Sequence, residues 1–335
     1  MNGSPGPTVP LIERAPHADW RAAGLRYNPY NRYLRARFGG RVQKVSIDAG
    51  FTCPNVDGTV AFGGCTFCDN RSFSPSRRVA RQAISEQIER GIRQLRLRYA
   101  RVERFVAYFQ PATNTYAAPD RLREVYETAL AHPAVVGLAI GTRPDCVPEE
   151  VLDLLTELAS RTYVSVEYGL QTIHDRSLAW MNRGHGYQAF LDAIERSRDR
   201  GFQICAHVML GLPGESRGDM LATAREIARL RLDAVKLHNL YVVPGTPLAE
   251  QVARGECELL ERDEYISILV DFLELLPPDT LVERISGDAP NDYFVGPAWC
   301  LDKPAVRQAL AAELARRDTW QGKQFDEQRT FGIQP

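Results

Sequence analysis

Three cysteines in one loop are the residues of this sequence best suited to chemistry. Cys53, Cys65 and Cys68 fall within a stretch rich in glycine that also contains Pro54, which predicts a loop rather than a helix or strand. A Cys-x2-Cys pair directs two sulfurs to one point from a single turn, and thiolates bind both zinc and iron. Three interpretations follow: a zinc site completed by a distant ligand, an iron–sulfur cluster, or a disulfide with a spare thiol.

The number of cysteines bears on this choice. Structural zinc sites are closed by four protein ligands, whereas a four-iron cluster held by three cysteines leaves one iron open to another molecule. The remaining cysteines, Cys146, Cys205, Cys257 and Cys300, are scattered singly along the chain, so we expect no second cluster.

The composition is that of an ordinary globular protein. The chain has 335 residues, of which 44% are hydrophobic and 25% charged, and its formal net charge of −1 argues against a strongly basic nucleic-acid module. No apolar run is long enough to predict a signal peptide or a membrane span, so we expect a cytoplasmic protein. Thiols stay reduced in that compartment, which weakens the disulfide interpretation.

From residue 42 onward, short apolar strands alternate with amphipathic helices. The expected strands are 45–49, 105–109, 135–140, 164–168, 202–210 and 234–243, and the expected helices are 84–99, 120–131, 148–160, 174–180, 187–200, 218–231 and 266–273. Repeated strand–helix units predict a parallel α/β sheet covered on both faces, because each helix must return the chain before the next strand can pair. Both a doubly wound sheet and a full or partial barrel fit this pattern.

Polar loops follow the expected strands where their carboxyl ends meet. Besides the cysteine loop after the first strand, these loops are 110–115, 141–145, 167–172 and 211–215. Ligands bind at the carboxyl-terminal edge of parallel sheets, so we expect one pocket lined by these loops and the cysteines.

At these motifs the sequence resembles the radical S-adenosylmethionine (SAM) enzymes, in particular the YhcC-like bacterial subgroup, with a core similar to that of the Elongator catalytic subunit. The matching segments are Cys65-Thr66-Phe67-Cys68, Thr142-Arg143-Pro144-Asp145, Glu167-Tyr168-Gly169-Leu170-Gln171 and Gly211-Leu212-Pro213-Gly214-Glu215. The resemblance implies a partial (β/α)6 TIM-like barrel over residues 41–276. A flexible tail and lead-in, residues 1–40, is expected before it, and a C-terminal extension, residues 277–335, after it. We expect the extension to cap the barrel mouth; the alternative is that it closes the bottom of the fold.

The resemblance also implies cofactors and contacts. Cys53, Cys65 and Cys68 would hold a 4Fe-4S cluster whose open iron binds SAM, and one electron would release a 5′-deoxyadenosyl radical that takes hydrogen from a substrate. The implied SAM contacts are Phe67, Gln110, Thr142, Glu167, Gln171, Arg183, His207 and Gly211. Gln171 and Arg183 are spaced like the SAM-contacting glutamine and arginine of oxygen-independent coproporphyrinogen oxidases. His207 has the alternative of being an ordinary hydrogen-bonded histidine of the barrel.

Two departures from the family pattern concern the SAM site. The eleven residues between Cys53 and Cys65 exceed the common Cys-x3-Cys-x2-Cys spacing, and residues 110–114 stand where a Gly-Gly-Glu usually meets the SAM amino group. No catalytic residue is assigned, because the substrate is unknown.

The resemblance also implies an electron donor such as flavodoxin or ferredoxin. Four arginines follow the cysteine loop and could attract a phosphate-bearing substrate such as RNA, unless they form only a solvated helix face. They are Arg71, Arg77, Arg78 and Arg81. Two other protein classes stay open at this point: a non-enzymatic zinc-stabilised binding module and a metal-independent phosphate-binding barrel.

Overall fold

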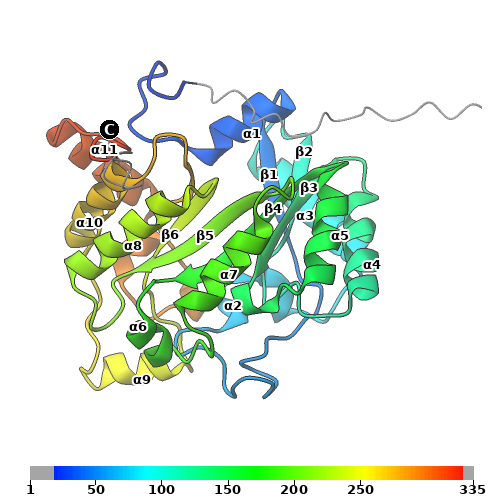
Figure 1. The fold of residues 1–335 in the computed structure, drawn as a ribbon, viewed down its shortest axis with the longest axis horizontal. Coiled ribbons are helices and arrows are strands. Elements are labelled where there is room, and N and C mark those ends of the chain that lie inside the picture. Colours follow the sequence, from blue (N-terminus) through cyan, green and yellow to red (C-terminus); the bar gives the residue numbers. More distant parts are fainter. Residues whose placement is uncertain (1–18, 327–335) are drawn as a thin grey trace, which may run out of the picture.

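The computed structural model of the chain describes residues 19–326 and is built on one curled sheet of seven parallel strands (Figure 1). The strands lie in the sheet in chain order, so each strand pairs with the one that follows it. They are β1 Val42–Ile47, β2 Arg104–Phe109, β3 Val135–Thr142, β4 Tyr163–Gln171, β5 Gln203–Leu210, β6 Ala234–Asn239 and β7 Leu281–Arg284. This arrangement confirms the α/β partial barrel and removes the doubly wound alternative, in which the strand order would reverse.

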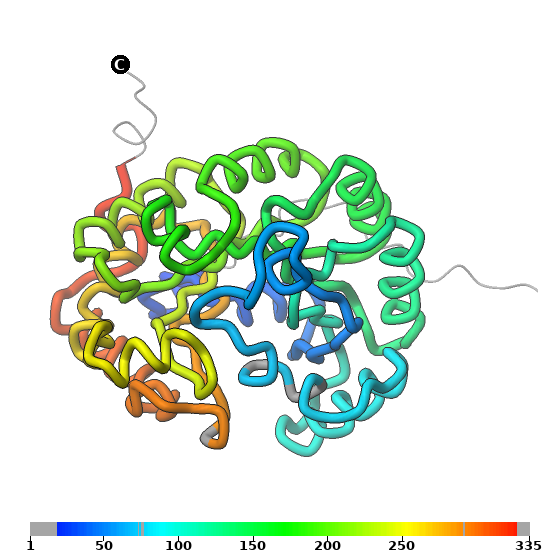
Figure 2. Tube along the Cα trace, turned by 90° about the horizontal axis from the view of Figure 1, so that it is seen from below, coloured from blue at the N-terminus to red at the C-terminus, as the bar shows by residue number. Residues whose placement is uncertain are grey.

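Helices lie before, between and after the strands, and the longer helices between the strands cover the convex face of the sheet, as the view onto one end of the barrel shows (Figure 2). They are α1 Tyr30–Phe38, α2 Asn70–Phe73, α3 Ile84–Arg98, α4 Pro119–Leu130, α5 Glu149–Ala159, α6 Asp175–Trp180, α7 Tyr187–Ser197, α8 Arg217–Leu230, α9 Pro247–Ala253, α10 Arg262–Leu275 and α11 Lys303–Arg316. Local sequence fixes several of their ends. Helix α8, for example, begins at Ser216 with a capping box, in which Ser216 and Asp219 satisfy each other's backbone N–H groups.

Packing between the strands and the helices forms the main core. Strand β3 is buried along almost its whole length, as its continuous apolar run predicts. Gly137 lets β3 approach β4 closely, because a Cβ atom at this position would lie 2.4 Å from the backbone carbonyl oxygen of Tyr163. None of the helices in the described part of the chain is long and apolar enough to cross a membrane.

Helix α1 lies against the inner face of the barrel near its amino-terminal end. Tyr30 and Tyr33 pack with Val42 of β1 and Tyr163 of β4, and the Tyr30 and Tyr163 hydroxyls are 2.6 Å apart. The segment that the sequence predicts as a tail and lead-in therefore contains a docked helix at residues 30–38. Residues 1–18, on which the expectation of a flexible tail rests, lie outside the described part.

A seventh strand is the main difference from the predicted fold. Strand β7 pairs in parallel with β6 and lies in the segment that we assign from sequence to the C-terminal extension. With four residues and a single apolar pair, Leu281 and Val282, it is too short to be recognised by alternation alone. After β7, the backbone N–H of Gly287 donates to Asn239 Oδ1 (2.9 Å) beside the end of β6, and α11 packs on α10.

Candidate active site

A cavity of about 650 Å³ opens at the carboxyl-terminal edge of the sheet. The cysteine loop, which follows β1, crosses the middle of this edge inside the ring of helices (Figure 2). Ten of the eleven predicted site residues line the cavity: Cys53, Cys65, Phe67, Cys68, Gln110, Thr142, Glu167, Gln171, Arg183 and His207. Gly211 does not line it; its backbone N–H donates to the Met220 sulfur (3.2 Å).

The cysteine loop is held in place by backbone hydrogen bonds to two distant segments. The Thr66 N–H donates to the Met181 carbonyl after α6 (3.0 Å), and the Leu248 N–H of α9 donates to the Thr66 carbonyl (3.0 Å). Asn182 adds a side-chain bond from its amide nitrogen to the Gly64 carbonyl (2.8 Å). Because Thr66 lies between Cys65 and Cys68, these bonds fix the turn that carries both sulfurs.

The three cysteines are free thiols at one wall of the cavity. Burial raises the pKa of Cys68, and the charges of neighbouring Cys65 and Cys53 raise it further. Three thiolates would therefore form together only if a positively charged group bound them. Iron supplies such charge, so the donor set fits a cluster.

The arrangement of donors also bears on the zinc interpretation. Among residues 19–326, no group of three histidine, cysteine or acidic side chains is placed to hold one metal ion. A four-iron cluster attaches each cysteine to a different iron, so its three sulfurs need not converge on one point.

Arg183 lies beside Cys65 and has no carboxylate partner among residues 19–326. It is 7% exposed, and its Nη1 and Nη2 atoms contact Cys65 Sγ (3.4 Å) and the Gly169 carbonyl (2.8 Å), respectively. Its Nε–H has no hydrogen-bond acceptor in the described part of the chain. Gly169 makes room for it, because a Cβ atom there would lie 2.8 Å from Nη2. The guanidinium is thus buried, charged and available to an anion.

Gln171 ends β4 in a backbone conformation that is rare for a residue with a side chain. Its φ is +71°, and the pairing between β4 and β5 shifts register between Tyr168 and Gln171. Such strain is retained mainly at functional sites, and here it lies at the cavity wall.

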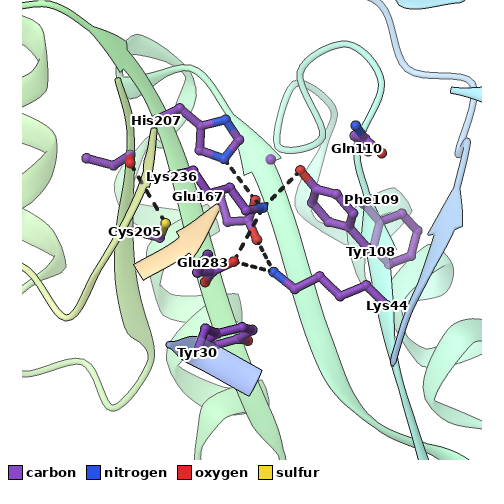
Figure 3. A network of polar contacts seen from close by, with 12 residues as sticks. Tyr30, Lys44, Tyr108, Phe109, Gln110, Glu167, Cys205, His207, Lys236 and Glu283 are labelled. Carbon is purple, nitrogen blue, oxygen red and sulfur yellow. Dashed lines mark hydrogen bonds and ion pairs between the residues drawn. The ribbon is translucent and has the colours of Figure 1, made fainter. Parts of the chain in front are cut away.

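A buried polar network lies at the inner part of the cavity (Figure 3). Glu167 is its centre: Oε1 accepts from Lys44 (2.7 Å), and Oε2 contacts Lys236 and the His207 ring nitrogen (2.9 Å). Lys44 also pairs with Glu283 of β7 (2.6 Å), and Lys236 donates to the Tyr108 hydroxyl (3.2 Å). Two lysines therefore balance two glutamates inside the barrel.

The network sets the protonation of its members. Burial alone would raise the pKa of Glu167, but Lys236 and Lys44 outweigh it and hold this pKa well below its usual range. Burial lowers the pKa of His207 despite its bond to Glu167, and lowers that of neighbouring His238 further. Glu167 is thus ionised and both histidines are neutral near pH 7.

Glu167 and His207 are both predicted SAM contacts. In the structure their side chains bond to each other, and Glu167 also bonds to Lys44 and Lys236. Four residues of this region were not predicted from the sequence: Tyr108, Lys236, Glu283 and the cavity-lining His238. The available signal was Lys236, a charged residue in the middle of the predicted strand that contains Ala-Val-Lys-Leu-His-Asn.

The four arginines after the cysteine loop bind their own chain. Arg77 pairs with Asp48 (2.9 Å) and donates to the Phe51 carbonyl (2.6 Å), while Arg81 donates to the Ala49 carbonyl (2.7 Å). Arg71 pairs with Asp69 (2.8 Å). Arg78 donates to the carbonyls of Arg71 and Ser72, and its guanidinium lies 4.6 Å from the centre of the Tyr293 ring. These side chains brace the segments on either side of the cysteine loop.

Two residues of the C-terminal extension show how it lies near the cavity, and the expected cap stays a prediction. Trp299 packs against Tyr265 of α10 (5.1 Å between ring centres), and its indole N–H donates to the Leu260 carbonyl (2.9 Å). Trp299 is not among the cavity-lining residues, whereas Arg284, at the end of β7, is.

Comparisons with known proteins agree with this geometry. The profile of the Radical SAM superfamily matches residues 60–227, and that of the Radical SAM C-terminal domain matches residues 232–316. YtqA of Bacillus subtilis is 41% identical over 302 residues, covering 90% of this chain and 93% of YtqA. YhcC of Escherichia coli is 37% identical over 274 residues, covering 82% of this chain and 87% of YhcC.

A more distant similarity connects the chain to Elongator. Elongator complex protein 3 of Bos taurus is 31% identical over 159 residues, which cover 46% of this chain and 28% of that protein. The solved structure of the archaeal Methanocaldococcus infernus Elp3 superposes with a TM-score of 0.64 at 20% identity, covering 84% of this chain and 64% of that one, and so shows the same fold. The chain therefore belongs to the radical SAM superfamily of enzymes, in the group that contains YhcC and YtqA and is related to the Elongator catalytic subunit.

Proposed function

We propose that this enzyme cleaves SAM reductively at a 4Fe-4S cluster bound by Cys53, Cys65 and Cys68, and acts on its substrate by a radical mechanism. The observation that carries the proposal is that three free cysteines line one cavity together with Arg183, whose guanidinium contacts Cys65 Sγ and has no carboxylate partner among the described residues. Bound there, the cluster and SAM supply one electron and a 5′-deoxyadenosyl group that removes a hydrogen atom from the substrate, while the protein supplies placement and exclusion of water.

Arg183 is the residue that we assign to the SAM carboxylate. A guanidinium can donate two parallel hydrogen bonds to a carboxylate, and such charge-assisted bonds are among the strongest in proteins. The free Nε–H of Arg183 offers one donor without breaking an existing contact.

Other cavity residues complete the proposed SAM site. Phe67, packed against the core cluster around Met181, provides an apolar surface for the adenine. Gln110, Thr142 and Gln171 place amide and hydroxyl groups along the sheet edge. Gly211 lies behind this wall and would act only by shaping the β5 loop.

The proposal is tested by anaerobic reconstitution of the full-length protein with iron and sulfide. We expect about four irons per chain and formation of 5′-deoxyadenosine from SAM after reduction. Cys65→Ala should lose the cluster, whereas Cys257→Ala, a matched change at a buried cysteine near α10, should keep it. Full iron content in Cys65→Ala would refute the ligand assignment, and bound zinc in the parent would restore the zinc interpretation.

The partners that we propose follow from this chemistry. A small reductant such as flavodoxin or ferredoxin would deliver the electron. RNA remains a hypothesis for the substrate, supported by the positive charge after the cysteine loop; the contacts of those arginines within the chain favour a smaller substrate held in the cavity.

A further inference from the structure

Most charged side chains that line the cavity are neutralised by a partner from the same chain. Arg71 pairs with Asp69, Arg77 with Asp48, and Arg143 with Asp145, all at 2.7–2.9 Å. Glu167 is balanced by the lysines of the buried network. Within the described residues, two cavity-lining guanidiniums remain without a carboxylate: Arg183, which the proposed function assigns to SAM, and Arg284.

Arg284 lies at the end of β7, where its backbone pairs with β6, and its side chain makes no hydrogen bond or ion pair with any residue of the described part. Its charge acts on three cavity-lining rings: it lowers the pKa of His238 and opposes the rise that burial gives to the pKa values of Tyr108 and Tyr241. The nearby acid Asp288 does not balance it, because Asp288 already pairs with Lys303 (2.8 Å). One positive charge is therefore left over in this part of the cavity.

His238 lines the same cavity as Arg284 and offers a further polar group to a ligand. The Tyr108 hydroxyl belongs to the buried network, because it accepts a bond from Lys236 (3.2 Å) and bonds to Glu167, so both its donor and its acceptor are already engaged. The Nε2 atom of His238 is buried without a partner among the described residues, and its ring lies beside that of His207 (5.2 Å between centres). The acids of this region are Glu167, whose two carboxylate oxygens are both engaged, and Glu283, whose Oε2 pairs with Lys44 and Lys236 while its Oε1 is buried without a partner among the described residues.

We propose that Arg284, with His238, binds a carboxylate group of the substrate. A single unpaired guanidinium matches a single negative charge, and its planar fork suits a carboxylate. This inference rests on the proposed function, because it takes the same cavity as the place where SAM and substrate meet. The substrate class is accordingly a small molecule or side chain that carries a carboxylate.

The test is a titration of the full-length, anaerobically purified protein with acetate at constant ionic strength, followed by NMR of its isotope-labelled histidines. The chain has six histidines, and a His238→Gln variant assigns the signal of interest. We expect the His238 signal to shift and saturate in the parent, and Arg284→Gln to weaken the apparent affinity for acetate at least about tenfold. Arg284→Lys, which keeps the charge but loses the fork, should fall between the two.

Arg71→Gln is the matched control, because Arg71 lines the same cavity but is already paired with Asp69; it should bind acetate as the parent does. Equal acetate binding by the parent and Arg284→Gln would overturn the inference. So would a His238 signal that shifts and saturates with dimethyl phosphate, an anion of the same charge, but not with acetate. The titration requires neither a cluster nor SAM cleavage. A failure of the proposed function would therefore appear in the reconstitution experiment and not in the titration.

Discussion

Replacing Glu167 by glutamine should destabilise the protein strongly, because Glu167 is the buried counter-charge of two lysines. Its side chain is fully buried and Lys236 is 5% exposed, whereas Lys44 is 19% exposed. At 2.7 Å and an effective dielectric constant of about 20, attraction between Glu167 and Lys44 amounts to about 6 kcal/mol. Desolvation offsets several kcal/mol of this per ion.

The expected net loss of stability depends on the charges that Glu167→Gln leaves buried. In Glu167→Gln, Lys44 and Lys236 share one carboxylate, that of Glu283, so one buried positive charge is uncompensated. Breaking a buried pair in this way costs about 3–5 kcal/mol. Adding Lys236→Met removes the surplus charge and leaves Lys44 paired with Glu283, so the double variant should recover a large part of the loss.

Urea unfolding followed by circular dichroism measures these free energies of unfolding. Glu157→Gln serves as the matched control, because Glu157 pairs with Arg123 on the surface and its loss should leave the free energy of unfolding essentially unchanged. A Glu167→Gln variant as stable as the control, or a double variant less stable than Glu167→Gln, would refute the assignment of Glu167 as the required counter-charge.

Three further predictions concern the cofactor site, the arginine braces and pH. Arg183→Gln should keep its iron but bind SAM about 10- to 100-fold more weakly in calorimetric titration, and unchanged affinity would remove Arg183 from the SAM site. The double variant Arg77→Ala, Arg81→Ala should release iron to a chelator faster than the parent, because both arginines bind carbonyl groups just before Cys53. RNA binding at low salt by the parent, but not by this variant, would support RNA as the substrate. The free energy of unfolding should fall as pH falls below about 6.5. The folded protein lowers the pKa values of His207 and His238, so the unfolded chain binds protons at a higher pH than the folded protein does. Urea titrations of His238→Phe should show a smaller fall with pH.

Local sequence patterns were sufficient for the parallel α/β sheet and for the cysteine loop, whereas the choice of a partial barrel came from the family resemblance. Strands such as β3 are continuous apolar runs, and Cys65 and Cys68 lie on one turn, so neither inference requires knowledge of distant contacts. The polar loops gather at one edge because parallel strands leave no other arrangement. This is why ten predicted residues meet in one cavity.

The buried network was beyond the reach of those patterns. Lys44, Glu167, Lys236 and Glu283 come from β1, β4, β6 and β7, and only the curl of the sheet brings their side chains together. The arginines after the cysteine loop illustrate the same limit. A count of charges predicts a positive surface, but whether Arg77 faces solvent or a backbone carbonyl depends on the path of the loop that it braces.

The charge balance of the buried network differs from that of the two cavity-lining arginines without a carboxylate partner in the described part of the chain. Burying a charge without a partner costs several kcal/mol, and this barrel avoids that cost by matching its two interior lysines to two glutamates. Among the described residues, Arg183 and Arg284 lack an acid in the same cavity, Arg183 beside the Cys65 sulfur and Arg284 half-buried at the end of β7. Two separate cations without acids are what a site for two anionic ligands requires, so the charge pattern agrees with SAM and a carboxylate substrate bound together.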